Sequence, residues 1–268
     1  MNKKILDWRA STVWVIGASS GIGAATARLL LDKGAQVVVS ARTLEPLQQL
    51  CQGRANALAV ALDIVDHASL QAGRNTILAH WPRIDLVLIV AGGYNEMRAD
   101  SFDLTAANRL IDLNLRGVFN CLDVVLPLLL QHSLPLDARA GAPAADVIGI
   151  GIVASVAGYG GLPKALVYGA TKAALINLTE SLYFDLHPRG IGVYQINPGF
   201  VDTPLTVGNN FKMPALMSAE AAAQELVLGM ERGQFHIHFP KRLSNPMRLA
   251  RLLPYRLYFW LVQKVTRL

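Results

Sequence analysis

The stretch VWVIGASSGIGAATARLL (residues 13–30) joins a short apolar run to a helix-like segment through a turn that contains three glycines. The apolar run has the valine and isoleucine content of a buried strand. Gly17, Gly21 and Gly23 lie in the turn and at the start of the helix. Backbone N–H groups and the positive end of a helix dipole are free at such a turn, so it can bind a pyrophosphate. We predict a dinucleotide-binding turn here, and a purely structural glycine turn is the alternative.

The same alternation of apolar runs and helix-length segments continues along the chain. Strands are predicted at 13–17, 35–40, 57–62, 85–92, 146–153, 192–197 and 235–239, and helices at 22–33, 44–52, 66–80, 104–131, 166–187 and 219–232. Repeated strand-helix units of this kind imply right-handed crossovers between parallel strands. We therefore predict an α/β fold with a Rossmann-type, doubly wound parallel sheet of about seven strands flanked by helices.

The composition fits a single large domain. The chain has 268 residues, of which 52% are hydrophobic and 16% are charged, and this balance suits a sheet buried under helices and argues against disorder. We expect one domain over residues 1–242 and a basic amphipathic extension over residues 243–268. No signal-peptide pattern or long uncharged apolar run is evident, so we expect a soluble, cytoplasmic body.

Two strand ends predict how the nucleotide is recognised. The second strand ends in Ser40-Ala41-Arg42, without the carboxylate that would bind the ribose hydroxyls of NAD. A guanidinium favours a 2′-phosphate, so Arg42 predicts that NADP(H) is preferred over NAD(H), unless Arg42 is an ordinary solvated arginine. Asp63, after the third strand, could bind the adenine amino group, and helix capping around Asp66 is the alternative explanation for an acidic residue here.

A second set of polar residues predicts acid–base chemistry. Tyr168 and Lys172 are four positions apart in a predicted helix, so both side chains can point into one cleft. An ammonium group beside a phenol stabilises the phenolate and lowers the pKa of the tyrosine. Ser155 follows the fifth strand, where its hydroxyl could bond a carbonyl oxygen, and Asn114 is an isolated amide among leucines.

These motifs, in this order, resemble the short-chain dehydrogenase/reductase family in its small, single-domain, NAD(P)-dependent branch. The likeness covers about residues 11–240 and includes GASSGIG (17–23), the four polar residues just named and NPGFVDTP (197–204). Two positions depart from the family pattern. Val90 replaces the usual asparagine after the fourth strand, which questions local hydrogen bonding, and Ile16 replaces a threonine before the first glycine.

The resemblance implies a role for each polar residue. Tyr168 would exchange a proton with the substrate oxygen, and Lys172 would lower the pKa of Tyr168 and bind the nicotinamide ribose. Ser155 would orient the substrate oxygen, and Asn114 would hold a water that links Lys172 to solvent. Together with the glycine turn and the strand ends, the expected cofactor contacts are Gly17, Ser19, Ser20, Gly21, Ile22, Gly23, Arg42, Asp63, Ile64, Ala91, Gly92, Tyr168, Lys172, Pro198, Gly199, Val201 and Thr203.

Two segments lie outside the regular alternation. Residues 132–146 are expected to form an unusually long surface loop. Residues 203–218 are irregular and follow a strand at the ligand-binding edge of the sheet, so we expect a substrate lid with Phe211, Met213, Leu216 and Met217 as its apolar residues.

The extension supplies much of the positive charge, because six of the 25 lysines and arginines fall in its neighbourhood, after Lys241. As a helix after Pro254, it would place Leu257, Tyr258 and Leu261 on one side and basic residues opposite. This pattern is typical of helices that lie in a membrane interface, and it also fits a helix that packs on a partner subunit or covers the substrate cleft. Membrane contact would make an apolar or lipid-like substrate more plausible.

Other features carry weaker predictions. Cys51 and Cys121 lack metal-ligand spacing and are expected to be buried thiols. His236 and His238 share a face of the last strand, and without a third ligand an exposed strand face is expected rather than a metal site. The positive charge fits no recognisable nucleic-acid module, so no nucleic-acid partner is expected.

The sequence thus favours an NADP(H)-dependent oxidoreductase that interconverts a carbonyl and a secondary alcohol, with Tyr168 as general acid/base. The expected assembly is a homodimer or homotetramer, and the expected partner is a small-molecule substrate. A non-catalytic dinucleotide-binding sensor or scaffold is the alternative, although such a protein has no need of Tyr168. A sugar-nucleotide epimerase is disfavoured by the glycine spacing and by the lack of a large C-terminal substrate domain.

Overall fold

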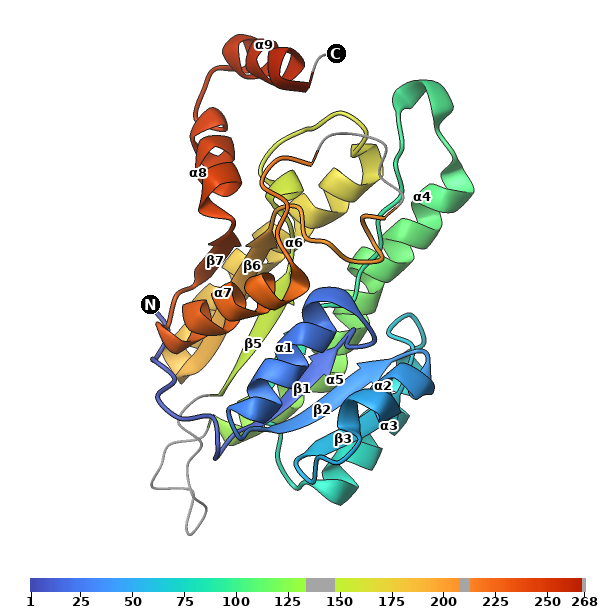
Figure 1. Cartoon of the computed structure of the whole chain (residues 1–268), viewed down its shortest axis with the longest axis vertical. Coiled ribbons are helices and arrows are strands. Elements are labelled where there is room, and N and C mark those ends of the chain that lie inside the picture. The colour runs from blue at the N-terminus through green and yellow to red at the C-terminus, as the bar shows by residue number, and fades with distance from the viewer. Residues whose placement is uncertain (134–147, 208–212, 267–268) are drawn as a thin grey trace.

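The fold is a doubly wound parallel sheet, as predicted (Figure 1). A computed structural model describes residues 1–133, 148–207 and 213–266. Its seven strands run in the order β3-β2-β1-β4-β5-β6-β7. They are β1 (Thr12–Ile16), β2 (Gln36–Ala41), β3 (Ala57–Ala61), β4 (Leu86–Ile89), β5 (Ile148–Val153), β6 (Ile191–Pro198) and β7 (His236–Phe239). Strand order reverses between β1 and β4, and ligands bind at the carboxyl ends of strands at such a switch point.

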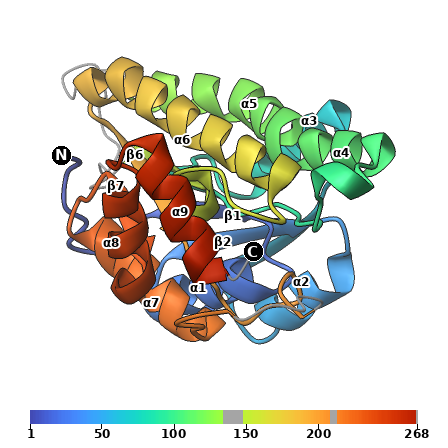
Figure 2. The same ribbon diagram turned by 90° about the horizontal axis from the view of Figure 1, so that it is seen from above.

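Helices cover both faces of the sheet, and two more follow the last strand (Figures 1 and 2). They are α1 (Gly21–Asp32), α2 (Leu44–Cys51), α3 (His67–His80), α4 (Leu104–Ile111), α5 (Gly117–His132), α6 (Leu166–Leu186), α7 (Ala219–Glu231), α8 (Lys241–Ala250) and α9 (Tyr255–Thr266). Helices α1, α2 and α7 pack on one face, and α3, α5 and α6 pack on the other. In Figure 2, α9 crosses over the carboxyl ends of the strands.

The first strand shows why a continuous apolar run predicts this sheet. All five residues of β1 are buried, with Val13 and Val15 facing one helical layer and Trp14 and Ile16 facing the other. Parallel strands covered on both faces have no polar side. The indole nitrogen of Trp14 still finds a partner, because it donates to the Ser40 hydroxyl at 2.9 Å.

The predicted helix over 104–131 is interrupted. A π-helical turn over Asp112–Arg116 separates α4 from α5, and Asn114 lies in it. Such turns insert one residue into a helix and often mark functional sites. Among the described residues, the stretch Leu104–Gln131 is the one helix long and apolar enough to cross a membrane. Its buried side chains pack in the core against the sheet; they include Val118, Cys121, Val125 and Leu129.

Two further expectations have different outcomes. A helix begins at Tyr255, directly after Pro254, as predicted, but α8 was not predicted. Helix α8 carries an internal proline, which disfavours a helix, although Leu243, Met247 and Ala250 recur at helical spacing. The expected long loop over 132–146 lies almost entirely outside the described residues.

Candidate active site

The glycine turn brings three chain segments together. Gly17 has φ of 98°, a conformation that other residues rarely adopt, and a Cβ atom there would collide with the backbone of Ala91. A Cβ atom at Gly23 would collide with the carbonyl oxygen of Gly17, and one at Gly21 would lie 2.8 Å from Thr203 Cγ2. Ser20 caps α1 with its backbone extended and makes no side-chain hydrogen bond to the helix. The first N–H groups of α1 therefore remain available to an anion.

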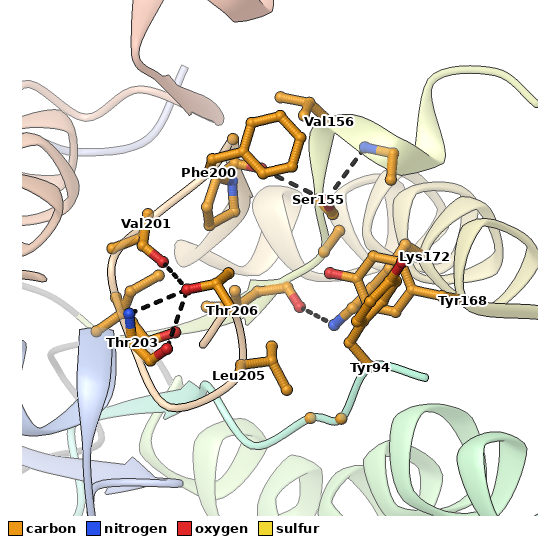
Figure 3. Close-up of a pocket in the computed structure, with 18 of the residues that line it drawn as sticks. Tyr94, Ser155, Val156, Tyr168, Lys172, Phe200, Val201, Thr203, Leu205 and Thr206 are labelled. Atoms are coloured by element: carbon orange, nitrogen blue, oxygen red, sulfur yellow. Dashed lines mark hydrogen bonds between the residues drawn. The ribbon is translucent and has the colours of Figure 1, made fainter. Parts of the chain in front are cut away.

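The turn lies at the edge of a cavity of about 1250 Å³. The residues that line it come from the ends of β1 to β6, from the 198–206 segment and from α6, α8 and α9. All the residues expected to contact the cofactor line this cavity. Figure 3 shows Tyr94, Tyr168 and Lys172 on one side of it and Val201, Thr203, Leu205 and Thr206 on the other. A dinucleotide fits the donor set and the space between these walls.

Arg42 and Asp63 lie at the end of the cavity where the sequence places the adenosine. Arg42 is exposed and follows β2, so its guanidinium has access to a ligand in the cavity. The Asp63 carboxylate accepts a hydrogen bond from Val65 N at 3.0 Å. The helix cap is Asp66, whose carboxylate accepts from the N–H groups of Ala68 and Ser69. Asp63 is thus not used as the cap of α3, and its role toward adenine stays a prediction.

Tyr168 and Lys172 lie together, one turn apart on α6. Lys172 is 4% exposed, its Nζ donates to the carbonyl oxygen of Val153 at 2.9 Å, and it lies 5.7 Å from the centre of the Tyr168 ring. A Cβ atom at Gly92 would lie 3.3 Å from both Lys172 Nζ and Asn114 Oδ1. The spacing in the sequence therefore does bring these groups to one place.

The pKa values differ from the expectation that Lys172 lowers the pKa of Tyr168. Burial raises the pKa of Tyr168, and the Ser155 hydroxyl acts in the opposite direction. Burial also lowers the pKa of Lys172 to about 8. The cause is that both groups are removed from water, which disfavours phenolate and ammonium alike. Near neutral pH, Tyr168 is therefore a protonated phenol, the state that can donate a proton to a substrate oxygen.

Ser155 and Asn114 take distinct positions. Ser155 begins the short helix Val156–Gly158, and its hydroxyl accepts from Ala157 N at 3.1 Å and donates to Pro198 O at 3.4 Å. It lines the cavity, whereas Asn114 lies behind the wall. The Asn114 amide is paired in both directions with the backbone of Gly93, at 2.7 and 3.0 Å. Asn114 thus fixes the segment after β4, where Val90 and Ala91 both donate to Ile16 O.

Several residues of the site were missed at the sequence level. Tyr94 packs edge-on against Tyr168, with ring centres 5.1 Å apart, and burial raises its pKa to about 12. The Thr171 hydroxyl donates a hydrogen bond to Tyr168 O at 2.8 Å and accepts one from Asn114 Nδ2 at 3.2 Å. The only local signal for Tyr94 is its place directly after Gly92-Gly93 at a strand end. Covering of the cleft by the tail was one of the alternatives left open, but the α9 side chains that reach the cavity could not be named from the sequence, because their approach depends on how the chain folds back.

The predicted lid is partly wrong. Met217 packs against the core and pairs with Val201 in an isolated bridge, and Met213 and Leu216 do not line the cavity. Phe211 lies outside the described residues. The residues of this segment that do line the cavity are Thr203, Pro204, Leu205, Thr206 and Pro214. The prediction placed the lid too late in the segment, because the bridge to Val201 holds Met217 against the core.

The expectation of an exposed strand face at His236 and His238 is also wrong. His238 is 6% exposed and is covered by α8: its Nε2 accepts from Arg248 at 3.1 Å, and its Nδ1 pairs with the Ser244 hydroxyl at 2.7 Å. His236 pairs with the Tyr159 hydroxyl at 2.8 Å. Among the side chains that the structure describes, no group of three or more His, Cys, Asp or Glu is placed to hold a metal ion. His238 thus joins α8 to the sheet, whereas the partners of His236 are Tyr159 and Asn197.

This histidine pair predicts acid sensitivity. Burial and the nearby charges of Arg248 and Lys241 lower the pKa of His236 to about 3 and that of His238 to about 4. The unfolded chain therefore binds more protons than the folded one as pH falls from about 6.5 to 4, and stability is lost in that window. A His236→Gln/His238→Gln variant should show a flatter fall of the urea midpoint between pH 7 and pH 4. Parallel curves for the variant and the wild type would contradict this assignment.

The cysteines fit their expected role only in part. Cys121 is fully buried, and burial raises the pKa of its thiol to about 12. Cys51 is half-buried at the end of α2.

Comparison with known proteins agrees with the fold and the motifs. The short chain dehydrogenase family model matches residues 11–213. An uncharacterized oxidoreductase of Myxococcus xanthus is 34% identical over 92% of this chain and 94% of its own length. Cis-4-hydroxycyclohexanecarboxylate dehydrogenase of Sinomonas cyclohexanicum is 35% identical over 79% of this chain and 80% of its own.

Solved structures agree as well. A short chain dehydrogenase from Burkholderia cenocepacia in complex with NADP has a TM-score of 0.80 at 20% identity, over 96% of this chain and 99% of that one. The 3-ketoacyl-(acyl-carrier-protein) reductase from Brucella melitensis complexed with NADH has a TM-score of 0.75 at 23% identity, over 87% of this chain and 98% of that one. At these identities, the likeness shows the fold.

Proposed function

The chain belongs to the short-chain dehydrogenase/reductase family of oxidoreductases, and we propose that it uses NADP(H) to interconvert a carbonyl and a secondary alcohol. The observation that carries the proposal is the grouping of Tyr168, Lys172 and Ser155 on one cavity with the open end of α1. The nicotinamide supplies or accepts the hydride when the cofactor is bound. A relative named as a dehydrogenase of a hydroxycyclohexane carboxylate supports the assignment of alcohol and carbonyl chemistry.

Each polar residue has a task in this proposal. Tyr168 gives its phenol proton to the substrate oxygen during reduction and takes one back during oxidation. Ser155 bonds the same oxygen and holds it toward Tyr168. Lys172 places a positive charge behind the phenol and reaches the ribose hydroxyls. Asn114 acts through others, because its amide fixes the Gly93 backbone and contacts Thr171.

The test of the proposal is a screen of carbonyl compounds that follows NADPH absorbance with the wild type and with Tyr168→Phe. At least one carbonyl should oxidise NADPH in a manner that depends on Tyr168. If the wild type binds NADPH tightly but no carbonyl is turned over, the proposal gives way to a dinucleotide sensor.

Arg42 gives a separate prediction about the cofactor. Its guanidinium would pair with the 2′-phosphate of NADP(H), a contact that NADH cannot make. Arg42→Ala should raise the KM for NADPH by roughly 10- to 100-fold, in line with the loss of a charge-assisted hydrogen bond, and leave the KM for NADH nearly unchanged. The measurement is the ratio of kcat/KM for the two cofactors. A ratio that does not move would sink the NADP(H) assignment.

The substrate in this proposal is apolar or lipid-like. The part of the cavity away from the glycine turn is lined by Leu205 and Pro214 and, on α9, by Leu261, Val262 and Val265. Apolar walls of this kind bury alkyl or ring groups and leave the polar set to hold the oxygen. A series of carbonyl substrates of increasing chain length would show kcat/KM rising with length.

The proposal also covers the domain division, the oligomeric state and the cellular location of the enzyme. Residues 1–242 form the catalytic domain, and residues 243–268 are an extension that covers it. Phe119 on α5 and Phe184 on α6 are 49% and 77% exposed, and large exposed aromatic side chains on neighbouring helices favour a homodimer or homotetramer. We place the enzyme in the cytoplasm, with peripheral contact at a membrane surface.

A further inference from the structure

The extension has two different faces. The inner face of α9 belongs to the cavity: Tyr258 is 6% exposed and donates to Gly161 O at 2.9 Å, and Leu261 and Val262 line the wall. A Cβ atom at Gly160 would lie 2.6 Å from the Tyr258 hydroxyl, so this helix is seated closely on the loop after β5. The inner face of α9 therefore agrees with the alternative in which the extension covers the substrate cleft.

The side of α9 away from the cavity carries exposed apolar side chains next to the exposed basic residues Arg256 and Lys264. Tyr255, Leu257, Phe259 and Trp260 are between 53% and 63% exposed. Leu249 at the end of α8 and Leu252 in the turn before α9 are 66% and 80% exposed. Exposed apolar side chains gathered on one short segment mark an interaction surface. We use "outer face" for these six residues.

The charge around the outer face has one sign. Eight lysines and arginines and no aspartate or glutamate follow Glu231, over 37 residues. Lys264 Nζ lies 5.0 Å from the centre of the Trp260 ring, and Arg251 lies 5.8 Å from that of Tyr255. Aromatic rings flanked by cations suit the boundary between lipid headgroups and acyl chains, where the rings enter and the cations stay with phosphates.

This pattern selects between possible occupants. A second copy meeting the outer face through a two-fold axis would bring its own basic residues against these, which is unfavourable. Nucleic acid would satisfy the charge but would leave Leu249, Leu252 and Leu257 without apolar partners. We propose that the outer face docks on an anionic lipid bilayer, which satisfies both the charge and the apolar side chains.

The position of α9 gives docking a consequence for the active site. In Figure 2, α9 crosses the molecule above the carboxyl ends of the strands, where the cavity lies. One helix therefore separates the bilayer from the cavity, with Phe259 and Trp260 toward the lipid and Leu261 and Val262 toward the site. An apolar carbonyl compound dissolved in the bilayer would enter alongside α9. This last step rests on the proposed function, whereas docking itself does not.

The test is co-sedimentation with vesicles, without cofactor or substrate, of the full chain and two variants. Phe259→Ser/Trp260→Ser removes the outer aromatic residues, and Phe102→Ser is the control, because Phe102 and Phe259 are both 53% exposed. Binding to vesicles of phosphatidylcholine and phosphatidylglycerol should exceed binding to phosphatidylcholine alone by roughly 10-fold and weaken in high salt. The double variant should lose roughly 10-fold in binding, and Phe102→Ser should lose none.

A fluorescence measurement places the contact. Trp260 is 57% exposed, whereas Trp8 and Trp14 are 4% and 0% exposed and the half-buried Trp81 packs against the core at the end of α3. Brominated acyl chains should therefore quench mainly Trp260. Trp260→Phe should keep vesicle binding and lose most of the quenching. Quenching that survives Trp260→Phe would put the contact elsewhere and overturn the proposal.

Three other results would also overturn docking: no binding to anionic vesicles, equal loss in Phe102→Ser, or a double variant that changes only the oligomeric state in sedimentation velocity. The readouts separate the two proposals. If the protein binds vesicles but reduces no carbonyl compound, only the proposed function is contradicted. If the enzyme is active but does not bind vesicles, only docking is contradicted.

Discussion

Replacing Tyr168 by phenylalanine is expected to lower kcat for carbonyl reduction by roughly 10³-fold, within the range that a positioned general acid contributes. The phenol is protonated near neutral pH because burial raises its pKa, so the wild type holds a proton ready for the substrate oxygen. Phenylalanine keeps the ring that packs edge-on against Tyr94 and loses only the hydroxyl. Binding of NADPH, followed by fluorescence titration, should therefore change by no more than about twofold.

Tyr183→Phe is the matched control, because Tyr183 lies on the same helix and its hydroxyl accepts from the N-terminal amine at 2.9 Å, away from the cavity. This variant should retain wild-type kcat. If Tyr168→Phe kept more than about a tenth of the wild-type kcat, another group would have to deliver the proton, since a missing general acid costs at least about 10²-fold. Ser155 would be the next group to test, as it lines the same wall.

The residues that the sequence predicts best are those whose signal is local. The glycine turn works this way: Gly17 needs a positive φ, and Gly23 must let a backbone oxygen approach, and both demands arise within a few residues of β1. Tyr168 and Lys172 are placed together by helix periodicity alone. The sequence signal for each strand of the sheet is local as well, because a strand buried on both faces must be apolar throughout.

Features set by distant contacts could not be predicted. The π turn at Asn114 depends on the Gly93 backbone, which lies 21 residues earlier in the chain. The pKa of Tyr168 depends on how completely the surrounding segments exclude water, which spacing on a helix does not reveal. The two histidines of β7 look exposed in an alternating strand because their partners are set by tertiary packing. His236 pairs with Tyr159, 77 residues earlier, and His238 pairs with Ser244 and Arg248 of α8, a helix that was not predicted.

The extension has one feature that a local sequence signal predicts and another that depends on distant contacts. Its amphipathic pattern predicts a helix with one apolar side, and α9 is that helix. The pattern does not distinguish an apolar side that meets lipid from one that meets protein. Tyr258 contacts Gly161, and Leu261 and Val262 line the cavity, while Leu257, Phe259 and Trp260 remain exposed.

Replacing Lys172 by methionine is expected to abolish most of the activity and yet to stabilise the fold at pH 7. The ammonium is nearly fully buried, and burial lowers its pKa from 10.5 to about 8. A shift of this size means that the charged form costs the folded state about 3 kcal/mol at pH 7. Methionine has a similar length without the charge, although Val153 O then loses its donor, at about 1 kcal/mol. The expected gain in the free energy of unfolding is thus about 2 kcal/mol, measured by urea titration.

The pH dependence separates this cause from a simple packing effect. Between pH 8 and 10.5 the folded wild type releases the Lys172 proton while the unfolded chain still holds it, so the wild type gains stability through that window. Methionine does not titrate, and the advantage of the variant should shrink to about zero near pH 10. A variant that is less stable than the wild type at pH 7, or one whose advantage is the same at pH 7 and pH 10, would show that the buried ammonium is not a cost to the fold. In the expected case, the buried ammonium destabilises the fold at pH 7, and its proposed tasks beside Tyr168 and the cofactor ribose give a reason for its presence.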